Sequence, residues 1–307
     1  MVSPLEIRCP IHGLIPLNAW EWDIVNQPAF QRLRRIRQLA WTDMVYPGAM
    51  HTRFEHSLGV MHISSRLVDA LWQRERELLQ SVYHYISEKM ERQKQLIRVA
   101  ALLHDIGHGP FSHAAESLLP RKPKGKQRYQ HEDYSAAIID HCLRDVIENH
   151  PDNKNGHNIQ VEEIKNLFSP SSISPDVLVW KNLVSGQLDA DRMDYLLRDA
   201  HHAGVSYGNF DLNRVIATIS LCQNVEESGY TIGIGDDGLH AAEGLIIARY
   251  MMFTQLYFHK TRAIYDHHLE KASSSILPKG EFPPPTEAGI KGFLDWDDWR
   301  VVGAIAA

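Results

Sequence analysis

Residues 96–113 read LIRVAALLHDIGHGPFSH, an apolar run that passes directly into a histidine–aspartate pair. Its first part, residues 96–103, is mostly apolar and has the pattern of a buried helix. His104 and Asp105 follow directly, and two glycines and a proline, the residues that end helices, come next. Neighbouring residues on a helix point in different directions, so His104 and Asp105 can reach one ion only if the helix ends there. A buried, unpaired aspartate is costly, so Asp105 requires a cation or several hydrogen-bond donors.

An earlier segment carries a further histidine that can reach the same ion. His56 shares the three- and four-residue spacing of Val60, Ile63 and Leu67, which places it on the inward face of a helix. A single histidine of this kind is more often a core residue bonded to a carbonyl. The presence of other ligand candidates favours a metal ligand here.

The stretch LDADRMDYLLRD, residues 188–199, supplies a second acid. Asp191, Tyr195 and Asp199 are four residues apart and form a polar stripe on one helix face. The alternative is a surface helix stabilised by ion pairs. Two neutral imidazoles and two carboxylates would balance a divalent ion (Mg, Mn, Fe or Zn) and leave positions for water and substrate. The expected ligands are His56, His104, Asp105 and Asp191.

The composition excludes several classes of protein. The chain has 307 residues, 44% hydrophobic and 23% charged, so it is neither a small disulfide scaffold nor a disordered chain. Its net charge of -6 argues against a uniformly basic nucleic-acid binder. Three scattered cysteines and the absence of a long apolar run favour a cytoplasmic protein outside membranes. Eighteen histidines point to metal or proton chemistry.

Helical periodicity dominates the chain, and strand signals are few. The alternation at residues 230–234 predicts a small β-hairpin. The apolar spacing predicts helices at residues 28–41, 55–79, 93–104, 131–147, 239–272 and 290–307.

Serines at 273–275 and prolines at 283–285 predict the one break between domains. We therefore expect a domain at 1–272 that contains the metal-ligand candidates, a linker at 273–288, and the start of a truncated C-terminal lobe at 289–307. The basic residues of 121–128 could hold phosphates or single-stranded nucleic acid, although a solvated loop is the simpler reading.

The ordered set of His56, His104-Asp105 and Asp191 resembles the H…HD…D signature of the HD-domain metal-dependent phosphohydrolases. The surrounding sequence is similar to the deoxynucleoside triphosphate triphosphohydrolase branch of that family, over roughly residues 7–272. The motifs that carry this resemblance are FQRLR (30–34), RFEHSLGV (53–60), HDIGHGPFSH (104–113), DRMDYLLRD (191–199) and YFHK (257–260). It implies an all-α fold that acts on deoxynucleoside triphosphates, usually as a homo-oligomer.

The resemblance also implies proton-transfer residues beside the metal: His108, His113 and His131, with Glu116 orienting His113. The spacing of His113 and Glu116 lets the carboxylate hold that imidazole protonated. An exposed histidine at a helix start is the alternative for His131.

By the same resemblance, three cations would bind phosphate oxygens: Arg53, Arg192 and Lys260. Five side chains would contact the deoxyribose: Gln38, Leu39, Tyr195, Asp199 and Tyr257. Arg249, eight residues before Tyr257, would also bind substrate. An aromatic core stripe with Phe253 is the alternative for Tyr257.

Two departures from the family pattern bear on regulation and binding. The family commonly has lysine at the position of Arg192. Its animal member binds activating nucleotides through a lysine followed by an Asn-Asp-Pro-x-His-Gly run, whereas residues 5–13 here read LEIRCPIHG. We expect no identical activator site.

The function expected from these residues is hydrolysis at the phosphorus next to the nucleoside, by metal-activated water or a neighbouring nucleophile. Deoxynucleoside and inorganic triphosphate would leave, assisted by a protonated histidine at the 5′ oxygen. Two alternatives remain open: a metal-dependent phosphodiesterase or nuclease on single-stranded nucleic acid, and a regulatory module that senses nucleotides without turnover.

Overall fold

The computed structural model describes residues 5–123, 125–168, 175–224 and 229–307. It is mainly helical and has two separate antiparallel strand pairs, which confirms the predicted fold class. β1 (Leu5–Cys9) pairs with β2 (Gly13–Leu17), and β3 (Ile219–Asn224) pairs with β4 (Gly229–Ile234). β4 contains the strand predicted at 230–234, and its partner strand precedes it in the sequence. The α-helices are α1 (Ala19–Val25), α2 (Pro28–Gln31), α3 (Arg53–Arg74), α4 (Arg76–Tyr83), α5 (Ser87–Leu103), α6 (His131–Ile138), α7 (Arg144–Glu148), α8 (Val161–Asn166), α9 (Pro175–Val184), α10 (Ala190–Ala203), α11 (Leu212–Thr218), α12 (Leu239–Met252), α13 (Lys260–Ile276), α14 (Glu287–Leu294) and α15 (Asp298–Ala306).

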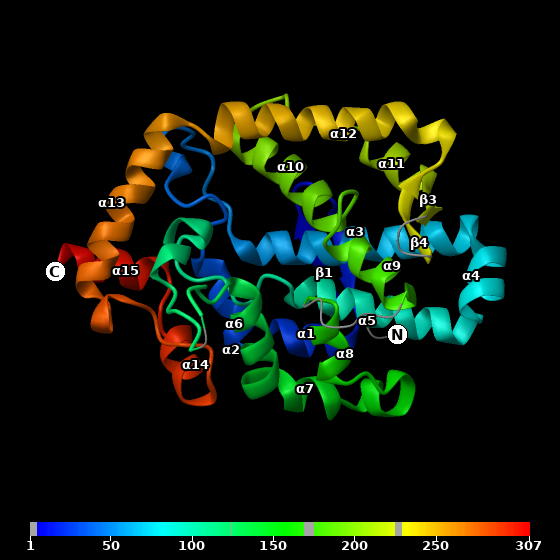
Figure 1. Ribbon diagram of the computed structural model, residues 1–307, viewed down its shortest axis with the longest axis horizontal. Coiled ribbons are helices and arrows are strands. Elements are labelled where there is room, and N and C mark those ends of the chain that lie inside the picture. The colour runs from blue at the N-terminus through cyan, green and yellow to red at the C-terminus, as the bar shows by residue number, and fades with distance from the viewer. Residues whose placement is uncertain (1–4, 124, 169–174, 225–228) are drawn as a thin grey trace.

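Three helices form the centre of the molecule and position the candidate site. α3 packs against both α5 and α10, and α6 lies beside the end of α5 (Figure 1). The face of α3 that carries Val60, Ile63 and Leu67 is fully buried, as its spacing predicts. His56 lies on this inward face and has no exposed surface.

The prediction of one helix over 239–272 is wrong. α12 ends at Met252 and a π-helical turn follows at Phe253–Tyr257. His259 then has extended backbone, and its ring accepts a hydrogen bond from the Thr261 N–H, which starts α13. α13 runs through the predicted break at 273–275 because Ser273 is buried against the core. Figure 1 shows the sharp change of direction between α12 and α13.

The N-terminal region also departs from its prediction. Residues 28–41 do not form one helix: α2 is followed by a short 3₁₀ helix at Arg32–Arg35, and Arg37 then pairs with Thr52 as an isolated bridge. The β1–β2 hairpin is not predicted at all. Gly13 ends its turn with φ 76°, a conformation that suits glycine.

Other helices differ in their bounds. The segment 55–79 divides between α3 and α4, the helix predicted at 93–104 begins earlier as α5, and 131–147 contains a π-helical turn between α6 and α7. No helix among the described residues combines the length and the apolar character needed to cross a bilayer.

The C-terminal residues fold as two helices, α14 and α15, where the sequence predicts one. Asp297 caps α15 by accepting a hydrogen bond from the Arg300 N–H, which separates the two. Phe293 and Trp296 are buried in the same hydrophobic core as the central helices. The boundaries 1–272, 273–288 and 289–307 stay a prediction.

The burial of Phe293 predicts that the C-terminal helices contribute strongly to stability. Its ring lies 4.2 Å from the Tyr134 ring, and the Arg32 guanidinium lies 4.9 Å from its centre. Phe293→Ala should lower the free energy of unfolding by about 3–5 kcal/mol, measured by chemical denaturation. Val302→Ala on the exposed side of α15 is the control and should change it by less than about 0.5 kcal/mol. If both variants changed the free energy of unfolding by the same small amount, the C-terminal helices would not contribute to the stability of the core.

Candidate metal centre

The end of α5 places His104 and Asp105 at one turn of the backbone. The helix ends at Leu103, and the next hydrogen bonds are those of tight turns, including His108 N–H to the Asp105 carbonyl at 3.1 Å. A side chain at Gly107 would overlap the backbone of α6, so glycine is required for this close approach. Ser135 of α6 closes the turn: it donates to the His104 carbonyl at 2.9 Å and accepts from the Gly107 N–H at 3.0 Å.

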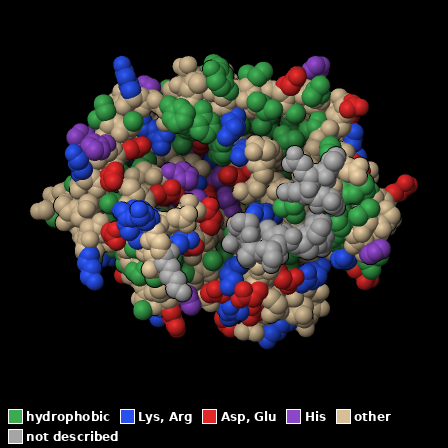
Figure 2. Space-filling view, in the orientation of Figure 1, with side chains coloured by type: hydrophobic (Ala, Val, Ile, Leu, Met, Phe, Trp, Pro, Cys, Tyr) green, Lys and Arg blue, Asp and Glu red, His purple; other side chains and the backbone are tan. Residues whose placement is uncertain are grey.

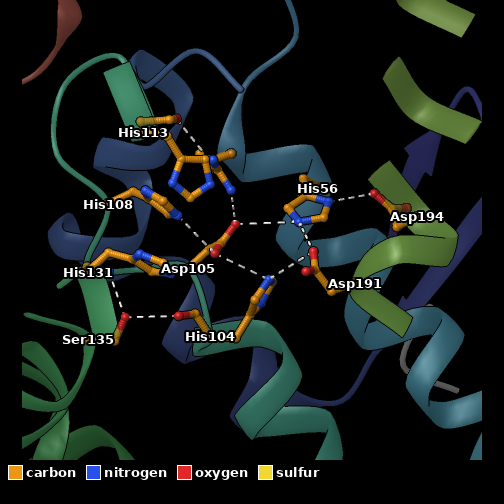
Figure 3. A network of polar contacts seen from close by, with 12 residues as sticks. His56, His104, Asp105, His108, His113, His131, Ser135, Asp191 and Asp194 are labelled. Carbon is orange, nitrogen blue, oxygen red and sulfur yellow. Dashed lines mark hydrogen bonds and ion pairs between the residues drawn. The ribbon is translucent and has the colours of Figure 1, made fainter. Parts of the chain in front are cut away.

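The four predicted metal ligands lie together (Figure 3). His56 Nε2 is 3.0 Å from Asp191 Oδ1 and 3.4 Å from Asp105 Oδ2. His104 Nε2 is 3.4 Å from Asp105 Oδ1 and 3.7 Å from Asp191 Oδ1. The ligand atoms of His56, His104 and Asp191 are mutually close enough to hold one ion.

Hydrogen bonds behind the two histidines prepare them as ligands. His56 Nδ1 lies 2.8 Å from Asp194 Oδ2, and His104 Nδ1 lies 2.7 Å from the Ala101 carbonyl. Both partners can only accept, so each Nδ1 carries the proton and each Nε2 presents a lone pair. Among the described residues neither Nε2 makes a hydrogen bond, although both atoms are buried. These orphaned nitrogens, facing carboxylates, fit a divalent cation, and the predicted metal cofactor is confirmed to that extent.

The charge state of the centre also suits a cation. Burial by itself would raise the pKa of Asp105, but the nearby Arg53 guanidinium and the imidazoles of His104 and His108 lower it well below its usual range. Arg53 forms an ion pair with Asp105 and donates to Ser112 Oγ at 2.9 Å. The buried carboxylate is therefore ionised at neutral pH.

A second cluster adjoins the first through His108. His108 Nε2 is 3.3 Å from Asp105 Oδ1, and its ring stacks on His131 with centres 4.0 Å apart. Glu116 Oε1 bonds both His113 Nδ1, at 3.0 Å, and His131 Nδ1, at 2.9 Å. The donor atoms of these four residues also lie close enough together to hold an ion.

The two inner histidines of this cluster have opposite preferences for a proton. Burial and the positive charges of Arg53 and His131 lower the pKa of His108 well below its usual value. Burial also opposes a charge on His131, but its bond to Glu116 and the nearby acids raise the pKa of His131. His131 is thus the better proton donor, and His108 the better lone-pair donor.

Both clusters open into one cavity of about 650 Å³. Figure 2 shows histidine and acidic side chains gathered in a hollow on this face. The wall carries apolar side chains together with polar ones, as sites for small organic ligands do. Its lining includes Gln38, Leu39, Arg53, His104, Asp105, His108, Phe111, His113, His131, Asp191, Tyr195, Asp199, Phe253, Tyr257, Phe258, Arg262 and Asp266.

Three predicted substrate-binding residues do not reach this wall. Arg192 bonds back to the carbonyl of Gly186 and the side chain of Gln187, in the loop before α10. Arg249 stacks on Phe253, with its guanidinium 5.0 Å from the ring centre. Their substrate roles stay predictions.

The break before α13 explains the position of the third, Lys260. It is the first residue of α13 and is exposed. Arg262, Ala263 and Asp266 face the cavity instead.

Sequence reasoning missed several polar residues that support the site. Asp194 accepts from His12 Nε2 at 2.6 Å and from Arg198 at 2.8 and 2.9 Å. Asp199 contacts His51 Nε2 at 2.7 Å and accepts from the Tyr257 hydroxyl at 2.7 Å. No spacing in the sequence links His12 or His51 to these acids. For Asp194, its place inside DRMDYLLRD was the available signal.

A histidine–aspartate pair at a helix end, completed by a histidine and an aspartate from two other helices, defines a metal-dependent hydrolase of the HD class. Residues 53–199 match the HD domain, and residues 210–306 match the HD-associated region. The chain belongs to the HD-domain phosphohydrolase family, which confirms the resemblance seen in its motifs.

Three relatives illustrate the match. An uncharacterized protein of Methanocaldococcus jannaschii is 36% identical over 266 residues, covering 87% of this chain and 48% of the relative. The human deoxynucleoside triphosphate triphosphohydrolase SAMHD1 is 30% identical over 314 residues, covering 94% of this chain and 46% of SAMHD1. A crystal structure of a hypothetical protein from Aquifex aeolicus is similar with a TM-score of 0.78 and 31% identity, covering 98% of this chain and 71% of that one. The chain thus spans about half the length of the first two proteins.

The geometry predicts that Asp191 is required for metal binding. Even changes behind metal ligands weaken affinity about 10- to 100-fold, so Asp191→Asn should weaken Mn²⁺ binding by at least that much. Titration with Mn²⁺ followed by electron paramagnetic resonance measures it. Asp199→Asn, two turns along the same helix, is the matched control and should bind Mn²⁺ like the wild type. Unchanged affinity in Asp191→Asn would exclude this centre.

Proposed function

We propose that the protein hydrolyses deoxynucleoside triphosphates to deoxynucleoside and inorganic triphosphate. One observation carries the proposal: three of the four metal-ligand candidates (His104, Asp105 and Asp191), the histidines of the second cluster and the Tyr257–Asp199 pair line the same cavity. Similarity to SAMHD1, which is named for this activity, supports it. Cytoplasmic location, homo-oligomer formation and the absence of a SAMHD1-like activator site stay predictions.

The proposed chemistry divides among side chains of this chain. His56, His104, Asp105 and Asp191 would hold a divalent ion, which supplies charge neutralisation on phosphate and acidifies water. Arg53 lines the cavity beside Asp105 and would bind phosphate oxygens. His131, held protonated by Glu116, would give its proton to the leaving 5′ oxygen.

The other wall of the cavity supplies a place for the sugar. Tyr257 donates to Asp199, and the Tyr195 and Tyr257 ring centres are 6.1 Å apart. Asp199 follows Asp191 by eight residues on α10, so this wall lies about 12 Å along the helix from the metal-ligand candidates. A deoxyribose would pack against Tyr257, with Gln38 and Leu39 as neighbouring contacts.

The nuclease alternative depends on the basic loop at 121–128, and two of the loop's cations are paired with acids within the chain. Lys122 pairs with Asp133, and Arg128 pairs with Glu281. Lys124 lies outside the described residues. Cations already neutralised by acids add little attraction for a phosphate backbone. These pairs favour a nucleotide over a polynucleotide as the substrate.

The decisive experiment incubates the protein with each of the four deoxynucleoside triphosphates and Mg²⁺ or Mn²⁺, and separates the products by ion-pair chromatography. We expect deoxynucleoside and triphosphate, and loss of turnover in Asp105→Ala. Nucleoside monophosphate from single-stranded DNA would favour the nuclease, and binding without any product would favour a sensor. Full turnover by metal-free Asp105→Ala would contradict the proposal.

The Glu116–His131 contact predicts a pH dependence. A raised pKa keeps His131 protonated to higher pH, so kcat should fall as pH rises through that pKa. Glu116→Gln removes the stabilising charge, lowers the pKa of His131, and should move the alkaline limb of the kcat profile about one unit or more toward acid. Glu243→Gln is the control, because Glu243 bonds His240 at 2.9 Å on the surface of α12. An unmoved alkaline limb in Glu116→Gln would refute His131 as the acid.

A further inference from the structure

The loop between His108 and His113 contains two consecutive residues in a costly backbone conformation. Phe111 has φ 57° and Ser112 has φ 54°, and neither is glycine. Left-handed backbone at such residues persists only where the surroundings hold it, and it is concentrated at functional sites. We name residues 108–113 the histidine loop, because His108 and His113 end it.

A carboxylate from the far end of the chain holds this backbone. Asp298, the first residue of α15, accepts the Phe111 N–H on Oδ1 at 2.7 Å, across 187 residues of sequence. Its other oxygen, Oδ2, accepts the Arg37 N–H at 2.8 Å. Asp298 is only 3% exposed, so water does not replace these two bonds.

Two further contacts fix the same loop. Arg32 donates from Nε to the Trp296 carbonyl and from a terminal nitrogen to the His108 carbonyl, both at 2.9 Å. Ser112 donates to the Arg37 carbonyl at 2.7 Å. The histidine loop is therefore held by hydrogen bonds at three points: at His108, at Phe111 and at Ser112. The partners are Arg32, Asp298 and the Arg37 carbonyl.

We infer that Asp298 is a positioning residue for the histidine loop, through which the HD-associated region sets the geometry of the proton-transfer histidines. Asp298 does not itself line the cavity, and its hydrogen bonds to Phe111 and Arg37 go to backbone amides rather than to a metal-ligand candidate. It acts through the Phe111 amide, two residues from His113 and three from His108. The consequence for catalysis rests on the proposed function, whereas the consequence for loop order does not.

The test compares Asp298→Asn with Asp297→Asn. Both replace a carboxyl group with an amide at the start of α15, but Asp297 caps α15 at Arg300 and pairs with Arg35, and it has no hydrogen bond to the described residues of the histidine loop. Hydrogen exchange followed by mass spectrometry measures the loop directly. Peptides covering 108–113 should exchange faster in Asp298→Asn alone, while peptides of α3 stay protected in both variants.

Activity provides the second readout. Small misplacements of catalytic groups cost about 100-fold, so kcat of Asp298→Asn should fall about 10- to 100-fold with little change in KM and unchanged Mn²⁺ affinity. Asp297→Asn should keep wild-type kcat. If the wild type hydrolyses no deoxynucleotide, the proposed function fails. The exchange data still test whether Asp298 orders the histidine loop.

Two results would overturn the inference: unchanged exchange at 108–113 in Asp298→Asn, or the same local increase in Asp297→Asn. If Asp298→Asn loses protection from hydrogen exchange throughout the chain, the variant is globally destabilised and Arg32→Lys replaces it in the test. Arg32→Lys removes the hydrogen bond to the His108 carbonyl and keeps the positive charge. Faster hydrogen exchange confined to 108–113 in that variant supports the inference that these contacts hold the histidine loop. An exchange rate equal to that of the wild type refutes it.

Discussion

The fold and the site both depend on one buried carboxylate, Asp194. Burial by itself would raise the pKa of this group, but Arg198, His12 and His56 hold it well below the usual range. Removing any partner would leave a charge unpaired in the interior, which is among the most destabilising changes a protein can suffer. The bonds of Asp194 join α10 to α3 and to the turn of the β1–β2 hairpin. Gly59 allows this closeness, because a side chain there would overlap Asp194 and Arg198.

The sequence predicts the parts of this arrangement that depend on local pattern. The inward face of α3, the helix end at His104 and the stripe of Asp191, Tyr195 and Asp199 follow from spacing alone. The break before α13 does not, because it depends on a histidine cap and a π-helical turn within an otherwise helical pattern. Contacts between distant segments likewise leave no periodic signal.

The residues of the candidate site likewise fall into those that local motifs predict and those that only the fold reveals. Its metal-ligand candidates come from motifs, whereas His12, His51 and Asp298 act through partners 182, 148 and 187 residues away. Each is an ordinary polar residue until the fold supplies its carboxylate or amide partner. Prediction from sequence therefore reaches the groups that would touch substrate more readily than the groups that hold them in place.

Asp105 lies between two groups of histidines: the metal-ligand candidates on one side and the proton-transfer candidates on the other. Its Oδ2 faces His56 and Arg53, and its Oδ1 faces His104 and His108. On one side, acceptors at Nδ1 leave imidazole lone pairs for a cation. On the other, a carboxylate at Nδ1 of His131 raises its pKa and keeps a proton available. Both imidazoles contact a carboxylate at Nδ1, and His56 is distinguished by its other nitrogen: its Nε2 faces Asp105 and Asp191, the carboxylates that would share a cation with it.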